Sequence, residues 1–215
     1  MYKAVIFDLD GTLLNTLTDL YNSVNHALGS FGFPERTIDE VRRFIGNGVK
    51  KLMERSTPVG TDEETNAECL DVFREHYLLH MADNTAPYEG VNELIEKLRE
   101  NGIKTAVVSN KLHPAVVGLC KDYFPGIECA IGVSVEEERK PNPVNVLKVL
   151  DTFSLKSDEC IYVGDSEVDV QTAHNASLKC IGVTWGFRDE KELIENGADF
   201  IAHNTDEVLK QVSGC

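Results

Sequence analysis

Two carboxylates stand at alternate positions near the start of the chain, where the apolar run Ala4 to Phe7 leads into Asp8-Leu9-Asp10-Gly11-Thr12. Ionised carboxylates this close repel each other, so the pair needs either a shared proton or a bound cation. We favour Mg²⁺, because it takes hard oxygen ligands and completes its shell with water and substrate phosphate. Asp8 would then attack a phosphoryl group while Asp10 handles the proton of the leaving group. The alternative is an Asp-Gly turn that closes a hairpin, with Asp8 on the surface.

A buried strand is the element that must position this pair, since residues 4–7 are apolar throughout and end in a glycine turn. From residue 90 onward, further apolar runs alternate with helical periodicity. Strands are expected near 105–108, 129–133, 160–163, 180–183 and 199–202, and a last helix near 206–212. Apolar strands separated by helices indicate a parallel sheet covered on both faces. The expected fold class is therefore α/β.

Residues 15 to about 82 show helical spacing and no strand pattern. Thr37-Ile38-Asp39-Glu40 is a candidate capping box that opens a short helix, which Gly46-Asn47-Gly48 interrupts. A longer helix is expected from about 63 to 81, and turn formers at 83–90 mark the return of the chain. We therefore expect an all-α insert at 15–82 and a core made of 1–14 and 83–215.

Polar side chains follow three of the expected strands. They are Asp8 and Asp10 after the first strand, Ser109 and Asn110 after the second, and Gly164-Asp165-Ser166 with Asp169 after a later one. In open α/β sheets the ligand crevice lies outside the carboxyl ends of the strands, so parallel pairing would bring these three ends to one edge. A single Asp at a strand end is more often a helix N-cap, and Asp165 or Ser166 could cap the helix that follows. Capping and catalysis can coexist at one position.

The composition narrows the classes of partner. A formal net charge of -15 and a pI near 4.8 argue against nucleic acid and anionic membranes, which would require a basic face. No apolar stretch approaches the ~20 residues that span a bilayer, and Met1-Tyr2-Lys3 leads into the strand without the apolar region of a signal peptide. We expect a cytoplasmic protein, a monomer or homodimer, that acts on a small phosphorylated metabolite.

The six cysteines are scattered and show no C-x-x-C spacing. They are Cys69, Cys120, Cys129, Cys160, Cys180 and Cys215. A zinc site or a disulfide framework is therefore not expected, and the cysteines are interpreted as reduced structural thiols.

Taken alone, Lys140 is a solvated lysine in a loop that follows an acidic run. The order of the motifs changes that interpretation. The sequence has Asp8-x-Asp10-Gly11-Thr12, then Ser109-Asn110, then Lys140-Pro141, then Gly164-Asp165-Ser166-x-x-Asp169. This order resembles all four motifs of the haloacid dehalogenase superfamily of phosphohydrolases, over residue 3 to about residue 186.

The resemblance implies a Rossmann-like three-layer core and a role for each motif residue. Asp8 would be the nucleophile that forms an aspartyl-phosphate, Asp10 the general acid and base, and Lys140 the cation that neutralises Asp8 and the transferring group. The implied Mg²⁺ ligands are Asp8, the backbone carbonyl of Asp10 and Asp165, with Asp169 supporting the metal from outside or through water. The implied phosphate-binding residues are Thr12, Ser109, Asn110 and Lys140. These roles agree with phosphoryl transfer, which depends on positioning and charge stabilisation. No organic cofactor is expected.

The resemblance also implies that the helical insert at 15–82 is a cap domain, which excludes water and carries specificity. Its loop Arg43-Phe44-Ile45-Gly46-Asn47-Gly48 looks like the cap signature of phosphoglycolate phosphatases, and Asn110-Lys111 and Val183-Thr184-Trp185-Gly186 also suit that subfamily. The implied substrate contacts are Arg43, Gly46, Asn47 and Gly48. The alternative is a simple turn between two helices. Arg139 and Ala176-Ser177 depart from the subfamily pattern, and neither belongs to the catalytic set.

The function that we expect is a Mg²⁺-dependent phosphatase, with 2-phosphoglycolate as the first candidate substrate. A pyrophosphatase or a β-phosphoglucomutase of the same fold are alternatives, although the loop at 45–48 disfavours the mutase. A non-catalytic phosphate-binding protein is the alternative from another class, and the intact set Asp8, Asp10, Lys140 and Asp165 speaks against it. A dehalogenase is disfavoured because those relatives lack the second aspartate, which is present here as Asp10.

Overall fold

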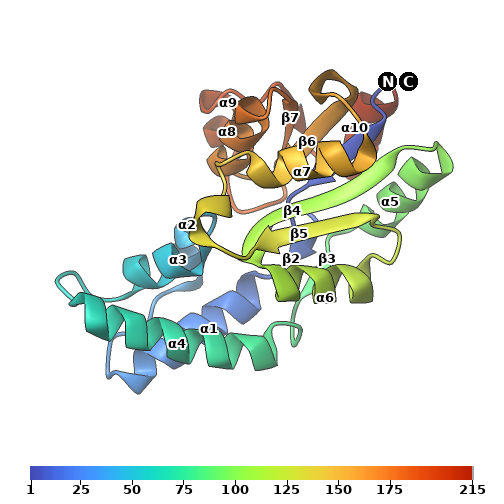
Figure 1. The fold of residues 1–215 in the computed structure, drawn as a ribbon. Coiled ribbons are helices and arrows are strands. Elements are labelled where there is room, and N and C mark those ends of the chain that lie inside the picture. Colours follow the sequence, from blue (N-terminus) through green and yellow to red (C-terminus); the bar gives the residue numbers. More distant parts are fainter. Residues whose placement is uncertain (215) are drawn as a thin grey trace. The chain divides into compact units, whose positions relative to one another are not determined.

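The computed structural model describes residues 1–214, and Cys215 lies outside the described residues. The chain separates into two compact units. One, called here the core unit, contains Met1–Leu14 and the chain from Pro87 onward; the other, called the helical unit, is Asn15–Ala86. Figure 1 shows both units coloured along the sequence.

Within residues 1–214 the core unit is built on a six-stranded sheet with the order β5-β4-β1-β6-β7-β8. The strands are β1 (Ala4–Phe7), β4 (Lys104–Leu112), β5 (Cys129–Val133), β6 (Cys160–Gly164), β7 (Lys179–Val183) and β8 (Phe200–Ala202). Every neighbouring pair is parallel, which confirms the fold class expected from the apolar runs. The opening strand β1 lies between β4 and β6, so it occupies an interior position in the sheet.

Helices cover both faces of this sheet. They are α5 (Val91–Glu100), α6 (His113–Tyr123), α7 (Val144–Phe153), α8 (Glu167–Asn175), α9 (Glu190–Glu195) and α10 (Thr205–Ser213), with short 3-10 turns η1 (Glu136–Glu138) and η2 (Ser157–Glu159). Side chains of β1 alternate between two apolar clusters, as a strand buried on both faces requires. Val5 and Phe7 pack with α5, α6 and α10, whereas Ala4 and Ile6 pack with α7 and α8. Figure 1 shows α6 and α7 on opposite sides of β4 and β5, in the expected three layers.

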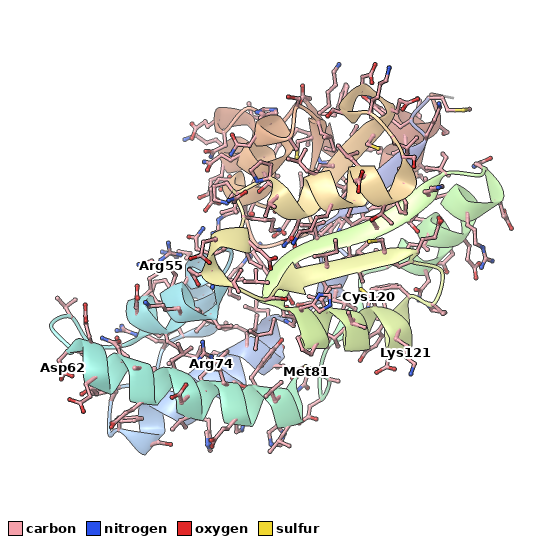
Figure 2. The ribbon with its side chains drawn as sticks, in the orientation of Figure 1. Arg55, Asp62, Arg74, Met81, Cys120 and Lys121 are labelled. Carbon is pink, nitrogen blue, oxygen red and sulfur yellow. The ribbon has the colours of Figure 1, made fainter. Side chains whose placement is uncertain are left out.

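The orientation of α6 illustrates this packing. Figure 2 shows Cys120 on the side of α6 that faces the sheet and Lys121 on the side that faces solvent. Cys120 is one of five cysteines in the described chain with free thiols, together with Cys69, Cys129, Cys160 and Cys180. Burial raises the pKa of Cys120 to about 12 and, together with Glu159, that of Cys160 to about 11. These five cysteines are therefore structural thiols, as expected, and the expectation for Cys215 falls outside the described residues.

The helical unit contains α1 (Leu17–Ser30), α2 (Ile38–Phe44), α3 (Gly48–Ser56) and α4 (Glu63–His80). Figure 1 shows α1 and α4 packed along each other. The expected capping box is present at the start of α2, because Glu40 N donates to Thr37 Oγ1 at 3.3 Å and Thr37 N donates to Glu40 Oε2 at 2.7 Å. No helix within residues 1–214 combines the length and the apolar character that a membrane crossing requires.

Two short strands, β2 (Leu14–Asn15) and β3 (Ala86–Pro87), pair with each other where the chain leaves the core unit and returns. Just inside the helical unit, the carboxylate of Asp19 accepts hydrogen bonds from the backbone and side chain of both Asn84 and Thr85. Asp19 is only 2% exposed. This buried carboxylate fixes the end of the insert to the beginning of α1.

Candidate active site

The sheet order brings three sets of polar side chains to one edge. Phe7, the last residue of β1, is in register with Val107 of β4 and Val163 of β6. Asp8 continues this alignment by donating its backbone N–H to the carbonyl of Val163 at 2.9 Å. The residues that follow the three strands therefore meet at the carboxyl end of the sheet, where open α/β folds bind ligands.

Three buried carboxylates meet at this edge. Asp8, Asp165 and Asp169 each offer an oxygen within 4.8 Å of the others. The ammonium group of Lys140 lies among them, 2.9 Å from Asp8 Oδ1 and 2.7 Å from Asp169 Oδ1. Lys140 itself is only 4% exposed, so it is a buried lysine of the site and not a solvated lysine of the loop.

The cluster brings three carboxylates to one ammonium group, so ionisation of all three carboxylates is unfavourable. Burial raises the pKa of Asp8 to about 7, although Lys140 opposes the shift. Burial, reinforced by Asp169 and Asp8, raises the pKa of Asp165 well above its usual range. Burial disfavours the charged form of Lys140, but Asp169 and Asp8 outweigh it and hold the pKa of Lys140 well above its ordinary value. A cation within the cluster would relieve this repulsion.

The donor set fits a hard divalent cation. Asp8 Oδ1 is buried, and the described part of the chain gives it no hydrogen-bond partner, although the Lys140 ammonium is close. With three carboxylates and one ammonium group in the cluster, a further cation at this buried oxygen would be stabilising. All three candidate ligands are carboxylates, the oxygen ligands that Mg²⁺ prefers. The residues present therefore match the Mg²⁺ that the sequence predicts.

Asp165 is held from two sides. Thr12 Oγ1 donates to Asp165 Oδ1 at 3.1 Å, and the backbone N–H of Phe187 donates to Asp165 Oδ2 at 2.8 Å. Gly11, at φ +85°, passes so close that an added Cβ would lie 2.4 Å from Asp165 Oδ2. Only glycine satisfies both the positive φ and the close approach. Thr12, for which the sequence predicts a phosphate contact, thus directs its hydroxyl at a candidate metal ligand in this structure.

Hydrogen bonds from Trp185 and Arg188 hold the segment after β7 that contains Phe187. Trp185 Nε1 donates to the carbonyl of Thr12 at 3.0 Å, and Arg188 Nε donates to Glu167 Oε2 at 2.9 Å. Arg188 is buried, and Glu167 is the first residue of α8. The sequence predicts no role for Arg188 or Glu167, because an Arg–Glu pair from separate segments leaves no spacing signal.

Asp169 combines helix capping with membership of the cluster. Its Oδ2 accepts from the backbone N–H and the hydroxyl of Ser166, at 3.1 and 2.6 Å, while its Oδ1 accepts from Lys140. Tyr162 adds a hydroxyl at 3.2 Å from Lys140 Nζ, and that hydroxyl donates to the carbonyl of Val108. Sequence reasoning missed Tyr162, because it lies within the apolar run of β6 and resembles an ordinary core residue.

The carboxylate of Asp10 lies outside the cluster of three and pairs with Lys111. Lys111 Nζ is 2.8 Å from Asp10 Oδ1 and 3.0 Å from Oδ2. Lys111 belongs to β4, which continues to Leu112 and is therefore longer than the strand expected at 105–108. In the sequence, Lys111 stands out only as part of the subfamily pattern Asn110-Lys111. Its position directly after Ser109-Asn110 is the signal that could have identified it.

Ser109 and Asn110 take different directions. Ser109 is buried, and its hydroxyl oxygen accepts from the backbone N–H of Lys111 at 3.3 Å. The Asn110 amide contacts the backbone of Lys140, accepting from its N–H at 2.7 Å and donating to its carbonyl at 3.3 Å. Asn110 thereby positions the lysine of the site, and its predicted contact with phosphate stays a prediction, as does that of Ser109.

The candidate substrate loop lies in the helical unit, between α2 and α3. Its glycines Gly46 and Gly48 have φ values of +117° and +77°. Arg55, labelled in Figure 2, donates to Asn47 Oδ1 at 2.6 Å and to the carbonyl of Phe44 at 2.9 Å. The loop is thus a turn between two helices that Arg55 stabilises, and Arg43 precedes it near the end of α2. Substrate contacts of Arg43, Gly46, Asn47 and Gly48 stay a prediction.

Comparison with known proteins identifies the family. Residues 5–183 match the family described as haloacid dehalogenase-like hydrolase. Phosphoglycolate phosphatase 1 of Pseudomonas aeruginosa is 32% identical over 220 residues, covering 96% of this chain and 78% of that protein. A phosphoglycolate phosphatase of Vibrio parahaemolyticus is 30% identical, with coverage of 98% and 96%. The crystal structure of a protein provisionally named a phosphoglycolate phosphatase, from Lactobacillus delbrueckii subsp. bulgaricus, has a TM-score of 0.93 at 32% identity and 98% coverage of both chains. The chain therefore belongs to the haloacid dehalogenase-like hydrolases.

Proposed function

We propose that this protein is a Mg²⁺-dependent phosphatase that hydrolyses a small phosphorylated metabolite through an aspartyl-phosphate on Asp8. The observation that carries the proposal is the placement of Asp8. It is buried at a strand end, 2.9 Å from the ammonium of Lys140 and beside Asp165 and Asp169. A carboxylate held against a cation and a candidate metal site is suited to attack phosphorus.

In the first half of the reaction, an oxygen of Asp8 forms a bond to phosphorus and the bond from phosphorus to the leaving oxygen breaks. Asp10, two residues further along the chain, gives its proton to that leaving oxygen. Lys140 stabilises negative charge on Asp8 and on the transferring phosphoryl group, because its ammonium already lies at the Asp8 carboxylate.

In the second half, Asp10 is a carboxylate and takes a proton from water. The water oxygen attacks phosphorus, the bond between phosphorus and Asp8 breaks, and inorganic phosphate leaves. Asp8 is then again a carboxylate and Asp10 again carries a proton, so the cycle closes without net change in the protein.

Asp8, Asp165 and the backbone carbonyl of Asp10 are the residues proposed to hold Mg²⁺, with Asp169 supporting them. When bound, Mg²⁺ supplies positive charge to the phosphoryl oxygens and offsets repulsion among the carboxylates. Phe187 N–H and the Thr12 hydroxyl orient Asp165 for this task. Outer partners of this kind commonly tune the affinity of a metal site.

We further propose that the helical unit is the cap and that Arg43 with the loop Gly46-Asn47-Gly48 selects the substrate. The unit is inserted between the first and second motifs, and specificity commonly resides in such lids. The first candidate substrate is 2-phosphoglycolate, supported by the names of the relatives above at 30–32% identity. Pyrophosphate and β-glucose 1-phosphate are the alternatives to exclude.

The test is phosphate release from 2-phosphoglycolate, pyrophosphate and a panel of other phosphorylated metabolites, with Mg²⁺ and with EDTA. Formation of glucose 6-phosphate from β-glucose 1-phosphate is measured in parallel and would indicate a mutase. With ³²P-labelled substrate and rapid acid quenching, wild type should carry a hydroxylamine-sensitive label that Asp8→Asn lacks. Phosphate release by Asp8→Asn within tenfold of wild type would refute the proposed nucleophile.

A further inference from the structure

We propose that Lys111 recognises a carboxylate on the substrate, next to the ester oxygen, and so contributes substrate selectivity from the core unit. This inference rests on the proposed function and refines its substrate class to short phosphorylated carboxylic acids. It starts from the pairing of Lys111 with Asp10, at 2.8 and 3.0 Å from the two carboxylate oxygens.

The backbone fixes where Lys111 lies. Ser109 and Lys111 are both buried, and Asn110 between them is half-buried. The register between β4 and β5 shifts between Val108 and Leu112. Gly132 of β5 permits this path, because an added Cβ there would lie 2.5 Å from the carbonyl oxygen of Lys111. The backbone of Lys111 is therefore packed against β5, and its ammonium is held by Asp10.

The second observation is the distance between the Lys111 ammonium and the place of the substrate's ester oxygen. In the proposed mechanism Asp10 comes within about 2.6–3.2 Å of the ester oxygen of the substrate. In 2-phosphoglycolate the carboxylate oxygens are three bonds from that oxygen, and bonds of about 1.2–1.5 Å keep them within about 3.5 Å of it. Lys111 Nζ is hydrogen-bonded to Asp10, so it lies within two hydrogen bonds, about 6 Å, of the ester oxygen, and a carboxylate attached there can turn toward it.

The third observation is the charge that a carboxylate on the substrate would meet at the site. Lys140 already contacts Asp8 and Asp169, and the phosphoryl group is its proposed partner during transfer. A substrate carboxylate bound at this buried site loses hydration, which is unfavourable unless a cation is close. Lys111 is that cation, since its side chain is 4% exposed and its ammonium is next to Asp10. An ammonium carries three donors and can serve two carboxylates at once.

The experiment compares two substrates that share a two-carbon phosphate ester and differ in the carboxylate, namely 2-phosphoglycolate and ethyl phosphate. For each variant, kcat and KM are measured with both. Lys111→Met removes the charge at similar side-chain length, and Lys111→Arg keeps it. Lys121→Met, on the exposed side of the neighbouring helix α6, is the matched control for the change in net charge.

The ratio of kcat/KM for 2-phosphoglycolate to that for ethyl phosphate should fall about ten- to hundredfold in Lys111→Met, as expected for one charge-assisted contact. Lys111→Arg should restore part of this ratio, and Lys121→Met should leave it unchanged. Both leaving groups are alkoxides that need a proton, so an effect of Lys111 on Asp10 should lower kcat/KM for both substrates. If Lys111→Met does not fold, as judged by circular dichroism, Lys111→Gln carries the same comparison.

A parallel loss with both substrates would overturn the inference, because Lys111 would then serve only to hold Asp10. The proposed phosphatase function would stand in that case. A wild-type protein that releases phosphate from other esters but not from 2-phosphoglycolate would instead overturn the proposed substrate, and this inference with it.

Discussion

Replacing Asp19 should destabilise the helical unit far more than replacing an aspartate on its surface. The Asp19 carboxylate accepts from Asn84 N at 3.0 Å, Asn84 Nδ2 at 2.8 Å, Thr85 N at 2.8 Å and Thr85 Oγ1 at 2.9 Å. Hydrogen bonds to a charged group contribute about 1.5–3 kcal/mol each, but they are not additive when they share one acceptor. Asp19→Ala leaves the buried donors of Thr85 without an acceptor, and we expect a loss of about 3–5 kcal/mol.

Asp19→Asn keeps the shape of the side chain but removes its charge. It keeps the size of the side chain, but it turns an amide NH₂ toward groups that are themselves donors, so we expect a loss of about 2–3 kcal/mol. Asp71→Ala is the control. Asp71 is an exposed residue of α4 whose partner Arg74, labelled in Figure 2, lies 3.0 Å away, and its loss should leave stability unchanged.

The assay is urea unfolding followed by circular dichroism, combined with hydrogen exchange of backbone amides. Exchange should accelerate in α1 and at Asn84 and Thr85, which would locate the loss in the helical unit. If Asp19→Asn unfolds at the same urea concentration as Asp71→Ala, the carboxylate does not anchor the insert and this reasoning is wrong.

Four further predictions concern the site. Asp165→Ala should raise the Mg²⁺ concentration for half-maximal activity and weaken Mn²⁺ binding measured directly, and an unchanged value would remove Asp165 from the ligands. Arg188→Met should produce a smaller shift in the same direction, because Phe187 N–H would be held less firmly on Asp165; wild-type Mg²⁺ dependence would show that this segment does not position the ligand. Asp10→Asn should lose more rate with 2-phosphoglycolate than with 4-nitrophenyl phosphate, whose leaving group needs little protonation, and equal losses would argue against proton transfer by Asp10. Arg43→Ala and Asn47→Ala should lower kcat/KM for 2-phosphoglycolate about ten- to hundredfold while sparing 4-nitrophenyl phosphate, whereas parallel losses would indicate an effect on closure or stability.

The layout of the core can be predicted from the sequence because its strands are apolar throughout. A run such as 160–163 is too short for a helix and has no polar face, so it fits only a strand buried on both sides. Once the strands are parallel, the residues that follow them must share an edge. This geometry is why Asp8 and Asp165 could be expected to lie together although they are far apart in the chain.

The contacts that depend on tertiary packing could not be predicted. Tyr162 satisfies the apolar pattern of β6 with its ring, and only the folded chain shows its hydroxyl beside Lys140. Asp19 meets Asn84 and Thr85 across the whole insert, with no periodicity that connects them. The length of β4 was also underestimated, because Ser109 and Asn110 are polar and suggest a strand end. Pairing with β5 extends the strand despite that polarity.

The pairing of β2 with β3 has a consequence for how this enzyme can be re-engineered. The two ends of the helical unit leave the core unit side by side, at Leu14–Asn15 and Ala86–Pro87. Segments with adjacent ends can be exchanged between homologous proteins without threading a new connection through the sheet. A chimaera that carries the insert of a relative on this scaffold should therefore keep the catalytic edge of the sheet while acquiring the donor's cap. Comparison of the substrate selectivity of this chimaera with that of the parent protein would show how much selectivity comes from Lys111 and how much from the insert.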